Sequence, residues 1–177
     1  MIKEKGIEVF ALAAERVKKI YENVGFSIIG DIEPNNQSGI SIDLIKEWEQ
    51  KGTLKYLGHT DNIAQIIQQY TAVVLPSYYR EGVPRSLLEA GALGRPIITT
   101  DNVGCRDAII DGITGFLCRP KDVDSLTDTI VKFIQLPYHE KEKMGKAGRT
   151  FIEQNFNEKV VIDKYLEKIR VFLINET

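Results

Sequence analysis

The sequence predicts a single α/β domain built on a doubly wound parallel sheet. Short apolar runs alternate along the chain with longer stretches of helical periodicity. The runs are continuously apolar, as in strands that are buried on both faces. Neither an internal repeat nor a low-complexity linker divides the 177 residues, which have the length of one ordinary domain. We therefore expect one domain over residues 1–177.

The expected elements follow the order of a parallel sheet, because each crossover between parallel strands needs a connection of helical length. The first is a helix over residues 6–22, where apolar residues recur every three or four positions. Asp61 is expected to cap a later helix. The other expected helices cover residues 41–49, 61–70 and 86–93, with a helical turn at 107–110. The expected strands cover residues 26–29, 54–57, 72–75, 96–100 and 115–118.

Three more helical stretches are expected to close the domain between about residues 120 and 173. We expect the last one either to be mobile or to bury its apolar stripe against a second copy of the chain. That stripe consists of Val161, Tyr165, Ile169 and Phe172.

The expected order begins with a helix, whereas a doubly wound domain normally begins with the central strand of its sheet. That first strand is therefore expected to be lacking. Residues 26–29 and 72–75 should then border a gap whose backbone N–H and C=O groups have no partners. Such edges favour low stability or self-association.

Composition and charge exclude several classes of function. With 27% charged residues and a net charge of -2, the balanced charge gives no reason to expect binding to nucleic acid or to an anionic membrane. Two cysteines, Cys105 and Cys118, are too few for a disulfide framework. The sequence contains neither an apolar run of about 18 residues nor a signal peptide at its start. These features are typical of a cytoplasmic protein.

Residues 75–90 carry the most informative pattern. A buried strand ends, a loop with Glu81 and Gly82 follows, and Pro84 leads into a helix that contains Glu89. In an open α/β sheet, ligands bind beyond the carboxyl ends of the strands. The pattern therefore predicts a binding site at the start of this helix.

The helix start suits a diphosphate, because it combines free N–H groups with a partial positive charge. Pro84 has no N–H, so the expected donors are Val83, Arg85 and Ser86. Gly82 allows a close approach of the backbone to a ligand.

The two carboxylates of Glu81 and Glu89 could each accept hydroxyl groups of a sugar, on opposite sides of the diphosphate. Two glutamates eight residues apart also occur by chance. In that alternative, Glu81 is a solvated loop residue and Glu89 an exposed helical charge.

The segment Glu81-Gly82-Val83-Pro84-Arg85-Ser86-Leu87-Leu88-Glu89 resembles the Glu-x7-Glu motif of the retaining GT-B glycosyltransferases often called family 4. The likeness covers residues 3 to about 165. Residues 104–107, together with residues 82–89, are similar to the branch that assembles bacterial surface polysaccharides from UDP-sugars. Further matches are Lys5-Gly6, Gly58, Pro76-Ser77, Ala90-x-Ala92-x-Gly94-x-Pro96-Ile97-Ile98, Val103-Gly104 and Asp111-Gly112-x-x-Gly115-Phe116-Leu117.

The resemblance implies that the chain is the C-terminal, donor-binding half of a GT-B enzyme, with a Rossmann-like sheet. It implies that Glu81 is a catalytic residue that binds donor-sugar hydroxyls and that Glu89 binds the ribose hydroxyls. Lys5 would help to neutralise the diphosphate, with no metal and no cofactor. The loops that frame the base would contain Gly30, Asp31, Gly58 and His59.

The implied activity is hexosyl transfer with retention, from a UDP-hexose or UDP-N-acetylhexosamine to a glycan or lipid-linked acceptor. The acceptor would bind through an N-terminal half, so the chain alone should be inactive, and the intact enzyme could lie at the inner membrane surface. Two alternatives stay open, a non-catalytic nucleotide-sugar-binding module and a nucleotide-sugar epimerase of GT-B fold. A dinucleotide-binding domain is disfavoured, because no Gly-x-Gly-x-x-Gly follows a first strand.

Overall fold

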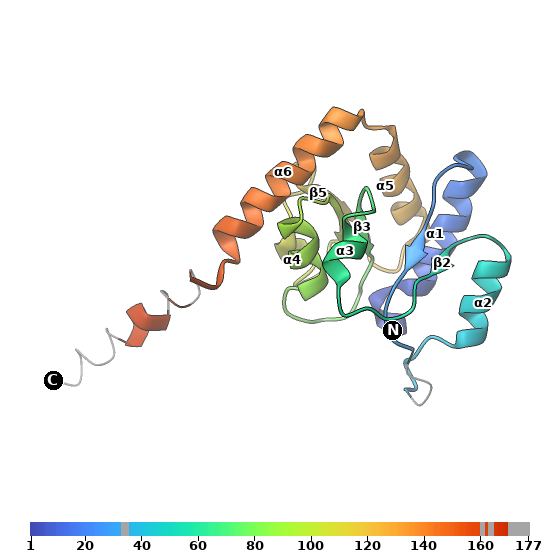
Figure 1. The fold of residues 1–177 in the computed structure, drawn as a ribbon, viewed down its shortest axis with the longest axis horizontal. Coiled ribbons are helices and arrows are strands. Elements are labelled where there is room, and N and C mark those ends of the chain that lie inside the picture. Colours follow the sequence, from blue (N-terminus) through green and yellow to red (C-terminus); the bar gives the residue numbers. More distant parts are fainter. Residues whose placement is uncertain (33–35, 160–161, 163–164, 170–177) are drawn as a thin grey trace.

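The computed structural model describes residues 1–32, 36–159, 162 and 165–169, and it confirms the α/β class (Figure 1). The α-helices are α1 (Ile7–Ile20), α2 (Ile42–Gln50), α3 (Ile63–Ile67), α4 (Arg85–Ala92), α5 (Val123–Gln135) and α6 (Tyr138–Asn155). The strands are β1 (Ser27–Ile28), β2 (Lys55–Tyr56), β3 (Val73–Leu75), β4 (Ile97–Thr100) and β5 (Gly115–Cys118). Two short 3-10 helices are η1 (Lys3–Lys5) and η2 (Arg106–Ala108).

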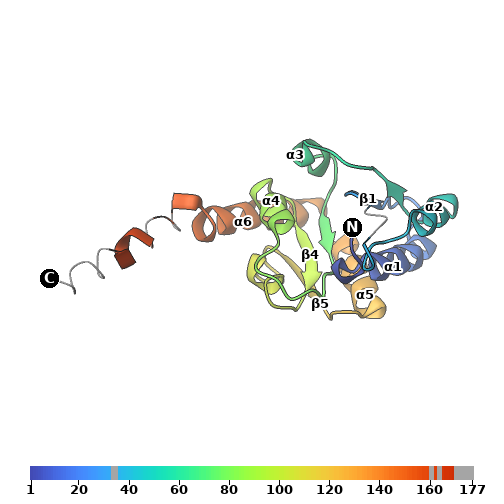
Figure 2. The same cartoon turned by 90° about the horizontal axis from the view of Figure 1, so that it is seen from below.

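The described strands form two parallel sheets instead of one. One sheet has the order β1-β2, and the other has the order β3-β4-β5. Ser27 pairs with Lys55 in the first sheet, and Val74 pairs with Ile98 in the second. Strands β1 and β3 are both edge strands, and they come from the two segments expected to border a gap (Figure 2).

The larger of two hydrophobic clusters joins the two sheets. Helix α1 packs against α5, and the apolar side chains of both helices meet residues from the two sheets. Phe10 of α1, for example, packs edge-on against Phe26, with 5.7 Å between the ring centroids. Ile28 of β1 and Ile98 of β4 belong to this same cluster. Burial of each such side chain contributes about 1.5–3 kcal/mol, so the two sheets are held as one body.

The one helix cap that was expected from the sequence is corrected by the structure. The third helix is capped by Asn62, whose side chain accepts from the N–H of Gln65, and Asp61 is not its cap. The asparagine replaces the aspartate because the helix begins at Ile63, later than expected. That helix is also shorter than the stretch 61–70, because it ends at Ile67.

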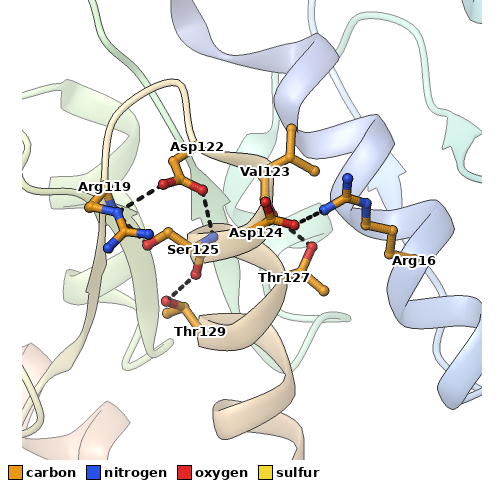
Figure 3. A network of polar contacts seen from close by, with 8 residues as sticks. All are labelled: Arg16, Arg119, Asp122, Val123, Asp124, Ser125, Thr127 and Thr129. Carbon is orange, nitrogen blue, oxygen red and sulfur yellow. Dashed lines mark hydrogen bonds and ion pairs between the residues drawn. The ribbon is translucent and has the colours of Figure 1, made fainter.

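Helix α5 begins in a network of polar contacts (Figure 3). Asp122 accepts from the N–H of Ser125 at 2.8 Å and from Nε of Arg119 at 2.8 Å. The N–H of Ser125 and the Arg119 guanidinium lower the pKa of the Asp122 carboxyl. Arg16 of α1 forms an ion pair with Asp124 (Figure 3). The network therefore ties the start of α5 to α1.

Beyond α6, the described residues 165–169 lie away from the body of the domain (Figure 1). Two residues of the apolar stripe expected there, Tyr165 and Ile169, have exposed fractions of 68% and 53%. The other two, Val161 and Phe172, lie outside the described residues. Whether this stripe packs against a second copy of the chain stays a prediction. Within the described ranges, every helix is too short or too polar to cross a membrane.

Candidate functional site

Hydroxyl groups on β4 form hydrogen bonds that hold the loop after β3 in place. The buried Thr99 donates from Oγ1 to the carbonyl oxygen of Leu75 at 2.7 Å. The next residue, Thr100, donates to the carbonyl oxygen of Ser77. Ser77 is itself fully buried. Because hydrogen bonds shielded from water hold their geometry, the first residues of the loop have a defined path.

The N-terminal segment of the chain lies against the same loop. The carbonyl oxygen of Glu4 accepts from the N–H of Tyr78 at 2.9 Å and from Oγ of Ser77 at 3.3 Å. Gly6 approaches Pro76 so closely that an added Cβ would lie 2.1 Å from the Pro76 carbonyl oxygen. Its φ of 79° also favours glycine. Lys5 is thereby held beside the loop.

Lys5 and Glu81 form an ion pair at this junction. Their side chains have exposed fractions of 30% and 23%, so the pair is partly shielded from water. Nζ of Lys5 also lies 5.9 Å from the centre of the Tyr79 ring. The structure thus brings together two of the residues that the sequence assigned to one site.

Helix α4 follows with an uncapped N-terminus. Its N-cap residue is the buried Pro84, and no side chain accepts from the first N–H groups. Glu89 is the fifth residue of the helix, about 6 Å along its axis at 1.5 Å per residue. Oε1 of Glu89 accepts from Nε of Arg85 at 3.0 Å. The Glu89 side chain is 32% exposed, whereas Arg85 is 91% exposed. Glu89 is therefore accessible to a ligand that displaces a solvated arginine.

A second loop, after β4, borders Glu81 from the other side. Nδ2 of Asn102 donates to the carbonyl oxygen of Tyr79 at 3.0 Å. Gly104 packs against the backbone of Glu81 and Gly82. The Glu81 loop is therefore positioned by three neighbours, namely the N-terminal segment, β4 and the loop that follows β4.

The loops assigned to a base also meet one another. The N–H of Gly30 donates to the carbonyl oxygen of Gly58 at 3.0 Å. His59 lies between two carboxylates, with Nδ1 3.0 Å from Asp31 and Nε2 3.2 Å from Asp61. The hydrogen bond to Asp61, followed by the charge of Asp31, raises the pKa of the His59 imidazole above its ordinary value.

The loops assigned to a base and the Glu81 loop all follow the carboxyl ends of strands. Gly30 and Gly58 follow β1 and β2, and the Glu81 loop follows β3, so both groups lie at carboxyl ends of parallel strands. The N-terminal segment links them, because the amino group of Met1 donates to the carbonyl oxygen of Asp31. Glu4 contacts the other loop through Tyr78, as described above. A ligand that spans both groups would lie along this segment.

Neither cysteine is suited to act as a nucleophile. Cys105 and Cys118 are both buried with free thiols. Burial raises the pKa of the Cys118 thiol to about 12, so it stays protonated. In the described part of the chain, histidine, cysteine and acidic side chains form no group of three that could hold a metal ion.

Sequence reasoning missed the residues that position the site. Thr99 and Thr100 lie in an apolar run and look like ordinary strand residues. Their hydroxyls are the first polar side-chain groups of that run. Because a buried hydroxyl needs a hydrogen-bond partner, they could have indicated a contact with a neighbouring loop. Asn102 gave no such signal, since polar residues are common in loops.

Comparison with known proteins shows the family to which the chain belongs. The model of the family "Glycosyl transferases group 1" matches residues 1–151, so the chain belongs to that family. The chain is 32% identical over 167 residues to the UDP-Gal:alpha-D-GlcNAc-diphosphoundecaprenol alpha-1,3-galactosyltransferase of Escherichia coli. That match covers 92% of this chain and 41% of the relative. The chain thus spans about two fifths of the length of this curated relative.

Solved structures show the same fold. The crystal structure of Anabaena HepE in complex with UDP superposes with a TM-score of 0.82 at 19% identity, over 94% of this chain and 45% of that one. The C-terminal domain of a group 1 glycosyl transferase from Francisella tularensis, LpcC, superposes with a TM-score of 0.75 at 24% identity. This match covers 89% of our chain and 83% of that domain. The fold is therefore that of a GT-B half domain.

Proposed function

We propose that this chain binds a nucleotide diphosphate sugar and forms the donor site of a retaining hexosyltransferase. The observation that carries the proposal is the grouping of Lys5, Glu81 and the uncapped start of α4 beyond the carboxyl end of β3. An ammonium group and free helix N–H groups together suit a diphosphate. The two carboxylates nearby suit the hydroxyl-rich groups on either side of it.

The ligand would exchange partners with the two ion pairs. In the structure, Lys5 forms an ion pair with Glu81, and Glu89 forms one with Arg85. A diphosphate would attract the ammonium of Lys5, which leaves the Glu81 carboxylate free to accept hydroxyls of the donor sugar. Glu89 would release the exposed Arg85 and accept the ribose hydroxyls. Glu81 is the catalytic residue in this scheme, because it contacts the sugar that is transferred.

The diphosphate would lie across the helix start. The backbone N–H groups of Val83, Arg85 and Ser86 would donate to its oxygens, while Gly82 would leave room for its approach. Pro84 contributes no donor, and it is the N-cap residue at which the loop ends and helix α4 begins. No metal ion is needed in this scheme, since Lys5 and the helix start supply the positive charge.

The base would be framed by the loops that contain Gly30, Asp31, Gly58 and His59. The hydrogen bond between Gly30 and Gly58 and the contact between His59 and Asp31 hold these loops together. UDP is named as the ligand of the Anabaena protein of the same fold. We therefore propose a UDP-hexose or a UDP-N-acetylhexosamine as the donor.

The acceptor would be a glycan or a lipid-linked sugar, bound between this domain and a second half. The E. coli relative is named for a diphosphoundecaprenol-linked acceptor, which supports a lipid-linked substrate. Retention would follow if the acceptor hydroxyl attacked on the face from which the diphosphate leaves, assisted by the diphosphate. The chain alone would bind the donor without transferring it, and the intact enzyme would act in the cytoplasm, at the inner membrane surface.

Calorimetry with UDP tests the proposal through Glu89. The Glu89→Ala variant should lose about 1.5–3 kcal/mol of binding free energy, the range for hydrogen bonds to charged groups. Glu153→Ala is a matched control, because Glu153 pairs with Arg149 at the same spacing on another helix, at 2.8 Å. Equal UDP affinity in the Glu89 and Glu153 variants would refute the assignment.

A further inference from the structure

Lys121 adopts a backbone conformation that side chains rarely tolerate. Its φ is 60°, and among the described residues it is the only one other than glycine with a positive φ. A residue in the left-handed region is strained by its own Cβ atom, whereas glycine has no such strain. Strain of this kind persists where neighbouring contacts fix the backbone, and it is often found at functional sites. A contact that only the lysine side chain can make would account for it.

Hydrogen bonds on both sides of Lys121 fix the turn that contains it, residues 119–122 (Figure 3). Ahead of Lys121, the N–H of Arg119 donates to Oγ of Ser125 at 2.9 Å. After it, Asp122 accepts from the N–H of Ser125 at 2.8 Å and caps helix α5. Neither hydrogen bond involves Lys121, so both hold the turn independently of the residue type at that position. They explain the left-handed backbone, but they do not explain the lysine.

The Lys121 side chain reaches the loop after β3. Its Nζ lies 4.6 Å from the centre of the Tyr78 ring, within the roughly 6 Å at which a cation is attracted to an aromatic face. Strands β3, β4 and β5 are parallel neighbours, so the loops after β3 and β5 lie at the same edge of their sheet. The contact therefore links the loop that contains Glu81 to the turn at the start of α5.

Tyr78 also contacts the N-terminal segment. Its N–H donates to the carbonyl oxygen of Glu4 at 2.9 Å. Burial, followed by the charges of Glu4 and Glu8, raises the pKa of the Tyr78 hydroxyl above its ordinary value. The ring therefore stays neutral near pH 7 and keeps the electron-rich face that attracts a cation. Tyr78 thus connects the Lys121 turn to the segment that carries Lys5.

We propose that Lys121 is a positioning residue of the donor site. Its ammonium holds the Tyr78 ring, and the backbone of Tyr78 in turn holds Glu4 and the neighbouring Lys5. Lys5 is thereby kept beside Glu81, with which it forms an ion pair. The attraction between Lys121 and Tyr78 partly offsets a backbone strain that glycine would avoid. The effect on donor binding rests on the proposed function, whereas the contact itself involves no nucleotide.

Amide hydrogen exchange in the free chain tests the positioning role with variants of Lys121. Lys121→Met removes the charge and keeps a long side chain, so the Tyr78 amide should exchange roughly two- to fivefold faster, the effect of one exposed cation–π contact. Lys121→Arg keeps a cation over the ring and should restore the slow exchange. Lys121→Gly should exchange as fast at Tyr78 as Lys121→Met, but it should melt no lower, because glycine relieves the strained backbone.

Lys132→Met is the matched control. Nζ of Lys132 lies 4.3 Å from the centre of the Phe116 ring, so this variant removes a similar contact elsewhere in the domain. Phe116 belongs to β5 and is buried in the larger hydrophobic cluster. The variant should therefore leave both the exchange of the Tyr78 amide and the affinity for UDP-glucose unchanged.

Calorimetry with UDP-glucose connects the contact to the donor site. Affinity should fall roughly two- to fivefold in Lys121→Met and Lys121→Gly, and it should be restored in Lys121→Arg. Equal affinity in Lys121→Met and the unmodified chain would overturn the proposal. So would lower affinity with unchanged exchange at Tyr78, because Lys121 would then contact the diphosphate directly instead of positioning the loop.

The exchange measurement separates this proposal from the proposed function. Exchange that accelerates equally at all amides of Lys121→Met would mark a general loss of stability and would overturn the positioning role. An unmodified chain that does not bind UDP-glucose would refute the proposed function. Faster exchange confined to Tyr78 and its neighbours in Lys121→Met would even then support the role of Lys121 in holding the loop.

Discussion

Gly104 and Glu81 are in direct backbone contact across two loops. A Cβ atom at residue 104 would lie 2.4 Å from the carbonyl oxygen of Glu81 and 2.4 Å from that of Gly82. Gly104 also has a φ of 81°, which side chains rarely tolerate. The position of the Glu81 loop, and with it the ion pair to Lys5, therefore depends on a glycine that follows a different strand.

Gly104→Ala should weaken donor binding by displacing Glu81. Gly112→Ala is the matched control, because Gly112 has a φ of 75° but no atom within 4 Å of an added Cβ. Both variants should lose about 1–2 kcal/mol of folding stability from the left-handed backbone, and Gly104→Ala should lose more because its Cβ clashes with the Glu81 and Gly82 carbonyl groups. Only Gly104→Ala should also lose affinity for UDP-glucose in calorimetry. If both variants bound UDP-glucose equally well, Gly104 would have no role in positioning the site.

Lys5→Gln should weaken UDP binding more than it weakens folding. Its ion pair with Glu81 is partly exposed, so its loss should cost at most about 1 kcal/mol of stability. The lost contact to a diphosphate is charge-assisted, which predicts roughly tenfold weaker UDP binding. Uridine affinity should not change, because uridine has no phosphate. Lys19→Gln, which removes an exposed pair with Glu15, serves as the control. An equal loss of uridine and UDP affinity would contradict a phosphate role.

His59 should titrate above the ordinary histidine pKa of about 6.5. Its pKa is raised by the hydrogen bond to Asp61 and then by the charge of Asp31. A raised folded-state pKa stabilises the fold below the unfolded-state pKa, and this stabilisation disappears as the pH rises through the folded-state value. NMR titration of the imidazole should show the raised pKa, and the Asp61→Asn variant should lower it. A pKa below the ordinary value in the unmodified chain would contradict this geometry.

The sequence predicted the elements well because their signals are local. Apolar runs and helical spacing located every strand of the described chain within about two residues. The cap of α3 was placed one residue early, since Asp61 and Asn62 are both good caps and only the helix start distinguishes them. The division into two sheets lies between β1 and β3, which come from the two segments that were expected to border a gap.

The sequence assigned residues to a candidate site, but it did not predict the contacts between them. The loop and helix after β3 identified Glu81 and Glu89, because their spacing is a local property. The pairing of Lys5 with Glu81 joins residues 76 positions apart, and no periodicity reports such a contact. The close approach of Gly104 is a property of two loops in space, which a single sequence does not encode in any local pattern.

The most direct measurement is an NMR titration of the backbone amides of this chain with UDP. We expect shifts at two places, the start of α4 at Val83, Arg85 and Ser86, and the loops at Gly30 and Gly58. Uridine should shift only the amide signals of the two loops, and pyrophosphate only those at the helix start, because each compound carries one half of the ligand. Shifts by UDP at both places, divided in this way between its halves, would support a donor site. Saturating UDP that leaves the amides at the start of α4 unshifted would contradict it.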